Sequence, residues 1–124
     1  MATRSTIGML LEDGETIRSV YCHWDGYPAH VGKILNEHYT NRSKIDQLLT
    51  LGDLSSLDKN IGEKHDFDSY QPDTWCTFYG RDRGESDVGP LIHESSEQWL
   101  DSRKGNGCEY GYLWDGICWT TFKI

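Results

Sequence analysis

The segment YCHWDGYP, which begins at residue 21, concentrates groups that could bind a ligand. It contains a thiol, an imidazole and a carboxylate next to three aromatic side chains. It lies where a predicted strand gives way to a predicted helix, and a helix N-terminus presents N–H groups that favour an anion. We predict that its ligand-contacting residues are His23, Trp24, Asp25 and Tyr27. The structural alternative is that Asp25 caps the helix and the aromatic rings cover the edge of the core.

Cys22 next to His23 suggests a nucleophilic thiol with a histidine base. A reactive thiol needs an exposed, electropositive setting. Neighbouring residues of a strand point to opposite faces, and the expected strand pairing places Cys22 on the core face. We therefore expect no catalytic residue here. An enzyme that acts on nucleotides through His23 and Asp25 is only a third hypothesis.

A second candidate is the loop YGRDRGE, which begins at residue 79. Arginine forks bind phosphate or carboxylate in a bidentate manner, and glycines let the backbone approach a ligand closely. The loop lacks the spacing of a P-loop. The structural alternative is a solvated turn whose charges pair with each other. The ligand-binding residues predicted in this loop are Tyr79, Arg81, Asp82, Arg83 and Glu85.

Charge and composition limit the class of partner. The 124 residues carry a formal net charge of −8, with 12 basic against 20 acidic side chains. Non-specific nucleic-acid binding needs clustered Lys and Arg, so it is not expected, whereas an acidic mimic of nucleic acid is compatible with this charge. The chain has neither an apolar run of about 20 residues nor a secretory signal, which predicts a cytoplasmic protein without a membrane partner. The four cysteines lack CxxC spacing, so we expect free thiols, no metal site and no cofactor.

The elements that must position these candidates begin with a hairpin. Alternating apolar residues flank Asp13-Gly14, a strong hairpin turn signal. A two-residue loop pairs Ile7 with Val20 and places Met9 on the same face, so this is the predicted core face. A helix follows from Pro28 to about Tyr39, and a second helix runs from Ser43 to Gly52 with Asp46 in a capping box.

The second half of the chain predicts a polar loop over residues 58–74, a strand over 75–79 and a charged loop over 80–89. Ser95 and Gln98 form a capping-box pattern that opens a short helix. A hairpin around Asp115-Gly116 ends the chain. Its two-residue loop pairs Trp114 with Ile117 and puts most of the aromatic side chains on one face, for the core or for a partner.

This order of elements predicts a single α+β domain over residues 1–124. Its sheet is expected to be antiparallel, with about five strands: two hairpins plus a middle strand. Two to three short helices are expected to pack on one face of it.

Four strings together resemble a family of small proteins encoded by bacteriophages and prophages. They are MATRSTIG at residue 1, YCHWDGYP at residue 21, LGDLSSL at residue 51 and YGRDRGE at residue 79. The resemblance spans most of the chain. It implies a setting, the cytoplasm of an infected bacterium, and no particular reaction. Small accessory proteins of phages often counter host defence.

Two functional hypotheses follow. The leading one is a non-catalytic protein that binds and sequesters a nucleotide-like anionic ligand, with arginines on the phosphates and an aromatic ring under the base. The alternative is an acidic inhibitor of a host defence protein, of the anti-CRISPR or anti-restriction type. Whether the chain forms a homo-oligomer is left open by the sequence.

Overall fold

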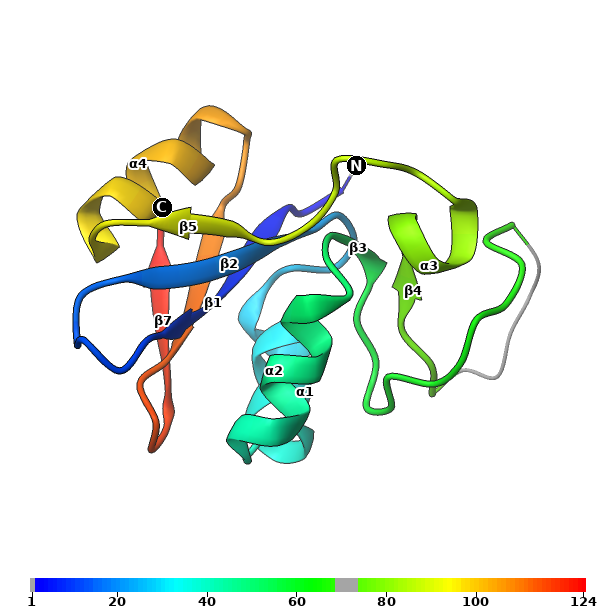
Figure 1. Cartoon of the computed structure of the whole chain (residues 1–124), viewed down its shortest axis with the longest axis horizontal. Helices are drawn as coiled ribbons and strands as arrows, with labels where there is room; N and C mark the ends of the chain where they lie inside the picture. Colours follow the sequence, from blue (N-terminus) through cyan, green and yellow to red (C-terminus); the bar gives the residue numbers. More distant parts are fainter. Residues whose placement is uncertain (1, 69–73) are drawn as a thin grey trace.

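A mixed β-sheet forms the centre of the molecule (Figure 1). The computed structural model describes residues 2–68 and 74–124. The seven strands are β1 (Ser5–Leu10), β2 (Ile17–Cys22), β3 (Leu54–Ser56), β4 (Thr77–Phe78), β5 (Leu91–His93), β6 (Tyr110–Trp114) and β7 (Trp119–Lys123). Their order is β4-β3-β2-β1-β6-β7, and β5 pairs with β2. The predicted α+β class is confirmed, but the prediction of an antiparallel sheet of about five strands is wrong.

The first hairpin has the predicted register. Ile7 lies opposite Val20, and the ladder ends where Leu10 pairs with Ile17. The carboxylate of Asp13 accepts hydrogen bonds from the N–H groups of Glu15 and Thr16 in the turn, at 2.9 and 2.8 Å. The side chains of Ile7 and Val20 are fully buried, so this is the core face that the alternation predicts.

Parallel pairing joins the two hairpins. β1 runs parallel to β6, starting where Ser5 lies opposite Tyr110. A parallel β3 and an antiparallel β5 lie along the other side of β2. Parallel neighbours need a long crossover, and here the crossover contains the helices and the three short strands. Such pairings between distant segments leave no local signal in the sequence, which is why the mixed sheet was not predicted.

Three helical segments cover the core face. They are η1 (Pro28–Gly32), a wide π-helical turn, α1 (Lys33–His38) and α2 (Arg42–Thr50). The cap of α2 differs from the prediction, because Asn41 accepts the hydrogen bond from the Lys44 N–H at 2.8 Å. Asp46, predicted as the acidic member of a capping box, instead pairs with Arg18 of β2 at 2.7 Å. The helix is thereby fixed to the sheet.

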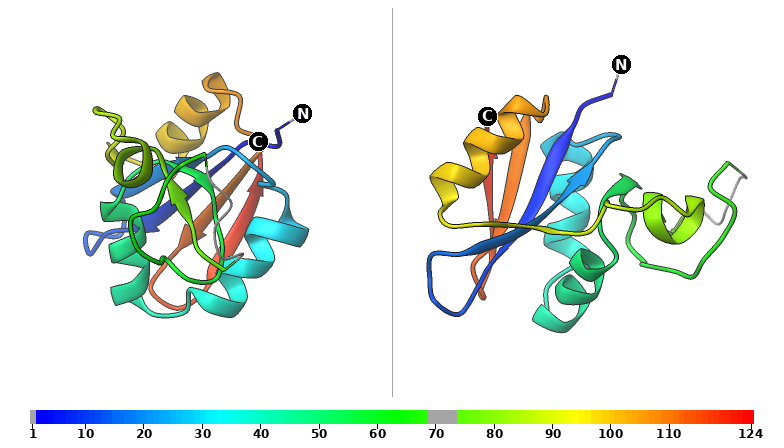
Figure 2. Two further views of the ribbon diagram at one scale, coloured as in Figure 1. Left: turned by 90° about the vertical axis from the view of Figure 1, so that its right-hand side faces the viewer. Right: turned by 45° about the horizontal axis from the view of Figure 1, so that its top comes forward.

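Another helix, α4 (Ser96–Gly105), covers the opposite face of the sheet, as Figure 2 shows. Its predicted cap is confirmed, since Ser95 accepts a hydrogen bond from the Gln98 N–H at 3.2 Å. The fully buried Trp99 packs against this face. The prediction that the helices pack on one face of the sheet is therefore wrong. Both faces of the central strands are covered. Within residues 2–68 and 74–124, no helix has the length and apolar character needed to cross a membrane.

The C-terminal hairpin has a longer loop than predicted. Trp114 lies opposite Trp119, not Ile117, so the register is shifted by two residues. Asp115 explains the wider turn, because its carboxylate accepts hydrogen bonds from the N–H groups of Ile117 and Cys118 at 2.8 and 2.9 Å. A shift of two preserves the faces of the strands, and both tryptophans are buried together. Ile117 is the exception, since it sits in the loop and is 86 % exposed.

Candidate functional site

The junction after β2 is held by its backbone on two sides. The N–H groups of His23 and Trp24 donate to the carbonyls of Leu54 and Ser55 in β3, both at 3.0 Å. On the other side, the Gly26 N–H donates to the carbonyl of Thr3 at 2.8 Å. The backbone from which the junction side chains project is therefore fixed to the sheet.

We term four side chains of this junction the junction surface: Tyr21, His23, Trp24 and Tyr27. Ring contacts join the first three, whereas the ring of Tyr27 lies 6.2 Å from that of His30. The Tyr21 hydroxyl and His23 Nδ1 share a hydrogen bond of 2.6 Å. The His23 ring meets the Trp24 ring edge-on, with centroids 4.7 Å apart. Trp24 and Tyr27 are 45 % and 39 % exposed, so two large rings face solvent from a braced backbone. Such rings can stack a planar ligand or fill a protein interface.

Asp25 has a structural part in this junction. Its backbone adopts the left-handed conformation with φ 55°, and its carbonyl accepts a hydrogen bond from the Val31 N–H at 3.3 Å. The first helical turn has no side-chain cap, so the alternative of an Asp25 cap is not what forms. The bend at Asp25 turns the chain from His23 toward η1.

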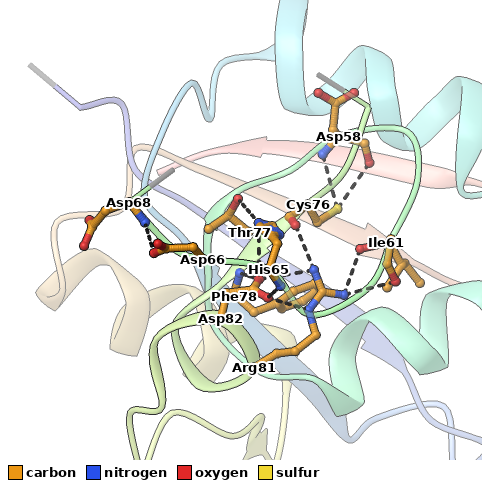
Figure 3. A network of polar contacts seen from close by, with 11 residues as sticks. Asp58, Ile61, His65, Asp66, Asp68, Cys76, Thr77, Phe78, Arg81 and Asp82 are labelled. Atoms are coloured by element: carbon orange, nitrogen blue, oxygen red, sulfur yellow. Dashed lines mark hydrogen bonds and ion pairs between the residues drawn. The ribbon is translucent and has the colours of Figure 1, made fainter. Parts of the chain in front are cut away.

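The predicted YGRDRGE loop contains a short helix, α3 (Tyr79–Arg83). Its Arg81 side chain, 12 % exposed, points into the protein. Figure 3 shows the guanidinium between the carboxylate of Asp82 and the carbonyl groups of Ile61 and Cys76. The five hydrogen bonds that it donates, to Asp82 twice and to the carbonyls of Ile61, Gly62 and Cys76, measure 2.9–3.3 Å. They use all five of its donors, so Arg81 has none left for a phosphate.

Asp82 is buried. We term Arg81, Asp82 and the backbone groups that they bond the clamp. The Asp82 carboxylate also accepts hydrogen bonds from the N–H groups of Phe78 and His65, at 2.8 and 3.0 Å. Burial by itself would raise the pKa of this carboxyl, but the hydrogen bonds from Arg81 and the two backbone groups lower it below its ordinary value. Arg81 and Asp82 are thus structural, and their prediction as ligand-binding residues finds no free donor or acceptor here to support it.

Arg83 has the opposite orientation. Its side chain is 54 % exposed and pairs with Glu85 at 3.5 Å. The guanidinium lies over the ring of Phe67 at 5.0 Å, and that ring lies 5.5 Å from the Tyr79 ring. Arg83, Glu85 and Tyr79 therefore form an accessible cluster with Phe67, a residue that the sequence analysis missed.

The two predicted segments lie side by side through Asp53. The carboxylate of Asp53 accepts a hydrogen bond from the Tyr21 N–H at 2.9 Å, and its carbonyl accepts one from the Tyr79 N–H at 3.2 Å. The fold thus brings Tyr79 to the junction surface, whereas it withdraws Arg81.

A buried polar cluster lies under α4, on the same face of the sheet as Tyr21. The hydroxyl of Ser19 and Nε2 of His93 are 2.8 Å apart, and Arg103 donates to the same hydroxyl at 3.4 Å. All three residues are at least nine-tenths buried. Burial, and then the positive charge of Arg103, lowers the pKa of His93 below its ordinary value of 6.5. The imidazole is therefore neutral at neutral pH.

This cluster predicts a pH dependence of stability. Because the pKa of folded His93 is lowered, the unfolded chain takes up a proton first as the pH falls through about 6.5, which favours unfolding. The free energy of unfolding, measured by urea denaturation between about pH 7.5 and pH 5.5, should therefore decrease. A His93→Gln variant should flatten this dependence, whereas His38→Gln, at an exposed position, should leave it unchanged. Identical pH profiles for all three proteins would contradict the assignment.

The thiols give no nucleophile at the junction. Burial raises the pKa of Cys22 to about 12, so its thiol is neutral and lies on the core face as predicted. All four cysteines are free thiols, and only Cys118 among them is exposed. Among the described residues, no group of three His, Cys, Asp or Glu side chains is placed to share a metal ion.

Comparison with family models, curated proteins and solved structures found no match to this chain. The phage-family resemblance therefore remains a prediction from its four motifs.

A hollow of about 420 Å³ lies far from the junction, at the other end of β2. Gly14 and Glu15 of the β1–β2 turn line it together with Glu94 and the first residues of α4. Its two carboxylates disfavour an anion. The candidate site for an anionic ligand is therefore the junction surface and not this hollow.

Proposed function

We propose that the protein is a non-catalytic binding protein, and that its junction surface holds a planar, nucleotide-like anionic ligand. The observation that carries this proposal is the Trp24 indole. It is 45 % exposed, yet it is braced by His23 and by a backbone hydrogen bond to β3. A ring held in place loses little entropy when a base stacks on it, and such stacking contributes about 1–3 kcal/mol per base.

The resemblance of the sequence to phage proteins supports a setting for this activity. In the cytoplasm of an infected bacterium, a protein that sequesters a nucleotide signal would counter host defence. The Tyr21 hydroxyl and the His23 imidazole lie next to the exposed Trp24 ring. These two polar groups support a ligand with hydrogen-bonding edges.

Replacing Trp24 with Ala is expected to weaken nucleotide binding by at least about tenfold, since it removes the stacking surface. The measurement is the shift of melting temperature with the four ribonucleoside diphosphates. Without ligand, the variant should melt close to the wild type, because the side chain is half exposed. Trp24→Phe should keep part of the affinity, and Ile117→Ala, at another exposed apolar position, should keep all of it. Equal shifts for the wild type and Trp24→Ala would contradict the proposal.

A protein-directed inhibitor is the second candidate. Exposed Trp and Tyr side chains are enriched in the energetic centres of protein interfaces, and Trp24 and Tyr27 lie on one junction. The net charge of −8 favours a basic partner surface, as an acidic mimic of nucleic acid would require. Affinity capture from host lysate at low and moderate salt, with Tyr27→Ala as the variant, separates the two candidates. A partner that needs Tyr27 and dissociates steeply with salt supports the inhibitor.

A further inference from the structure

Two arginines near the junction surface make no ion pair within 4 Å among the described residues, although the charge of Arg103 acts on the nearby carboxylate of Asp53. Arg4 is exposed and directly precedes β1, while Arg103 lies in the last turns of α4 and is 4 % exposed. Among the described residues, neither guanidinium has a carboxylate oxygen within 4 Å.

The guanidinium of Arg103 is incompletely satisfied. Its Nε is buried without a hydrogen-bond partner in the structure. Its bond to the Ser19 hydroxyl, at 3.4 Å, is long, and that hydroxyl also binds His93. A buried N–H group without an acceptor is costly, and one on a charged group more so. An oxygen atom of a bound anion would supply the missing acceptor.

Arg4 lies on the same face of the sheet. Arg4 directly precedes Ser5, whose pair with Cys22 ends the β1–β2 ladder, and its charge acts on the Tyr21 hydroxyl of the junction surface. The Arg4 guanidinium passes over Gly107, where a Cβ would lie 2.9 Å from Nη1. Gly107, which follows α4 with φ 84°, therefore leaves room for Arg4.

Cys108 connects the two arginines. Burial raises the pKa of its thiol to about 11, the charges of Arg103 and Arg4 act in the opposite direction, and the nearby carboxylate of Asp53 adds to the rise. Both cations thus lie close enough to act on one buried thiol, and Arg4 also acts on the hydroxyl of Tyr21. Gly107, which Arg4 passes over, precedes Cys108, and the Cys108 N–H donates to the Arg103 carbonyl at 3.1 Å, so both arginines contact this segment.

We propose that Arg4 and Arg103 form a phosphate subsite, and that the ligand is a nucleoside phosphate whose base lies on Trp24. This inference rests on the proposed function and replaces Arg81 as the anchor of the phosphates. Two guanidinium groups can each offer parallel N–H donors to phosphate oxygens, which a lysine cannot do.

The test uses three kinds of probe with the full chain: inorganic pyrophosphate, the four ribonucleoside diphosphates and the four nucleosides. Thermal shifts and calorimetric titrations give the affinities. Arg4→Ala should weaken pyrophosphate and diphosphate binding at least about tenfold and leave nucleoside binding unchanged. Arg42→Ala, an exposed arginine of α2 on the other face, is the matched control and should bind like the wild type.

Arg103→Lys is the second variant, because it keeps the buried charge and loses the fork. It is expected to lose pyrophosphate affinity as well. The subsite is wrong if pyrophosphate and the diphosphates do not bind, or if both variants bind them as the wild type does. Pyrophosphate binding that needs Arg4, without any nucleoside or Trp24 dependence, would uphold the subsite and refute the nucleotide function. Nucleotide binding that requires Trp24 but not Arg4 would uphold the nucleotide function and refute the subsite.

Discussion

Replacement of Arg81 with Ala should lower the free energy of unfolding by about 3–5 kcal/mol, a large share of the stability of a typical domain. The substitution leaves the Asp82 carboxylate buried without its counter-charge. It also frees the carbonyls of Ile61, Gly62 and Cys76, which Arg81 holds together across the segment before α3. Urea denaturation followed by tryptophan fluorescence should show a lower midpoint with little change in slope.

Arg83→Ala is the matched control for this clamp. Arg83 lies two residues away on the same short helix, but it is exposed and its contact with Glu85 is 3.5 Å. Its loss should change stability by no more than about 0.5 kcal/mol. Arg81→Lys should fall between the two, because one ammonium group cannot replace five donors. If Arg81→Ala left the midpoint unchanged and abolished ligand binding, Arg81 would be a site residue, as the sequence suggested.

The contrast between Arg81 and Arg83 explains why this part of the site could not be predicted. In an α-helix, residues two apart point about 200° away from each other. Once Tyr79–Arg83 forms a helix, one arginine must point inward when the other faces solvent. The sequence predicted a loop there, and in a loop the two side chains are equivalent. The partners of Arg81 are carbonyl groups, which no residue type reveals.

Local signals did predict local structure. The Asp13-Gly14 turn and the alternation of apolar residues set the register of the first hairpin and the burial of Cys22. The Ser95 cap was predicted by the same kind of short-range rule. The mixed sheet depends on contacts between β1 and β6, about a hundred residues apart, and these follow from packing of the whole chain.

Part of the missed site did have a signal in the sequence. The predicted β1–β2 register, extended to Ser5, pairs it with Cys22, so Arg4 was expected at the end of β2 where the junction begins. Arg103 lies four residues after the buried Trp99, on the same face of its helix, which predicts burial of a charge. The proximity of Arg103 to Ser19 and His93 was beyond prediction, because it depends on where α4 crosses the sheet.

Replacement of Trp99 with Ala should cost about 3–5 kcal/mol of stability, because it removes the largest fully buried side chain among the described residues. The indole lies over Gly8 and Gly111, where an added Cβ would come within 3.1 and 3.3 Å of its ring. It meets Phe122 edge-on at 6.0 Å and donates a hydrogen bond from Nε1 to the Thr6 hydroxyl at 3.0 Å. Urea denaturation measures the loss, and Trp99→Phe should recover part of it.

Trp24→Ala is the matched control, since it removes the same side chain from an exposed position. The two variants should behave oppositely: Trp99→Ala loses stability, while Trp24→Ala loses ligand and melts close to the wild type. The distinction also tests the two-sided sheet. If Trp99→Ala lost less than about 1 kcal/mol, α4 would not be packed on the sheet, and the positions of Arg103 and His93 under it would be wrong as well. A large loss of stability in Trp99→Ala supports the packing of α4 on the sheet. That packing fixes the position of Arg103, which belongs to the proposed phosphate subsite.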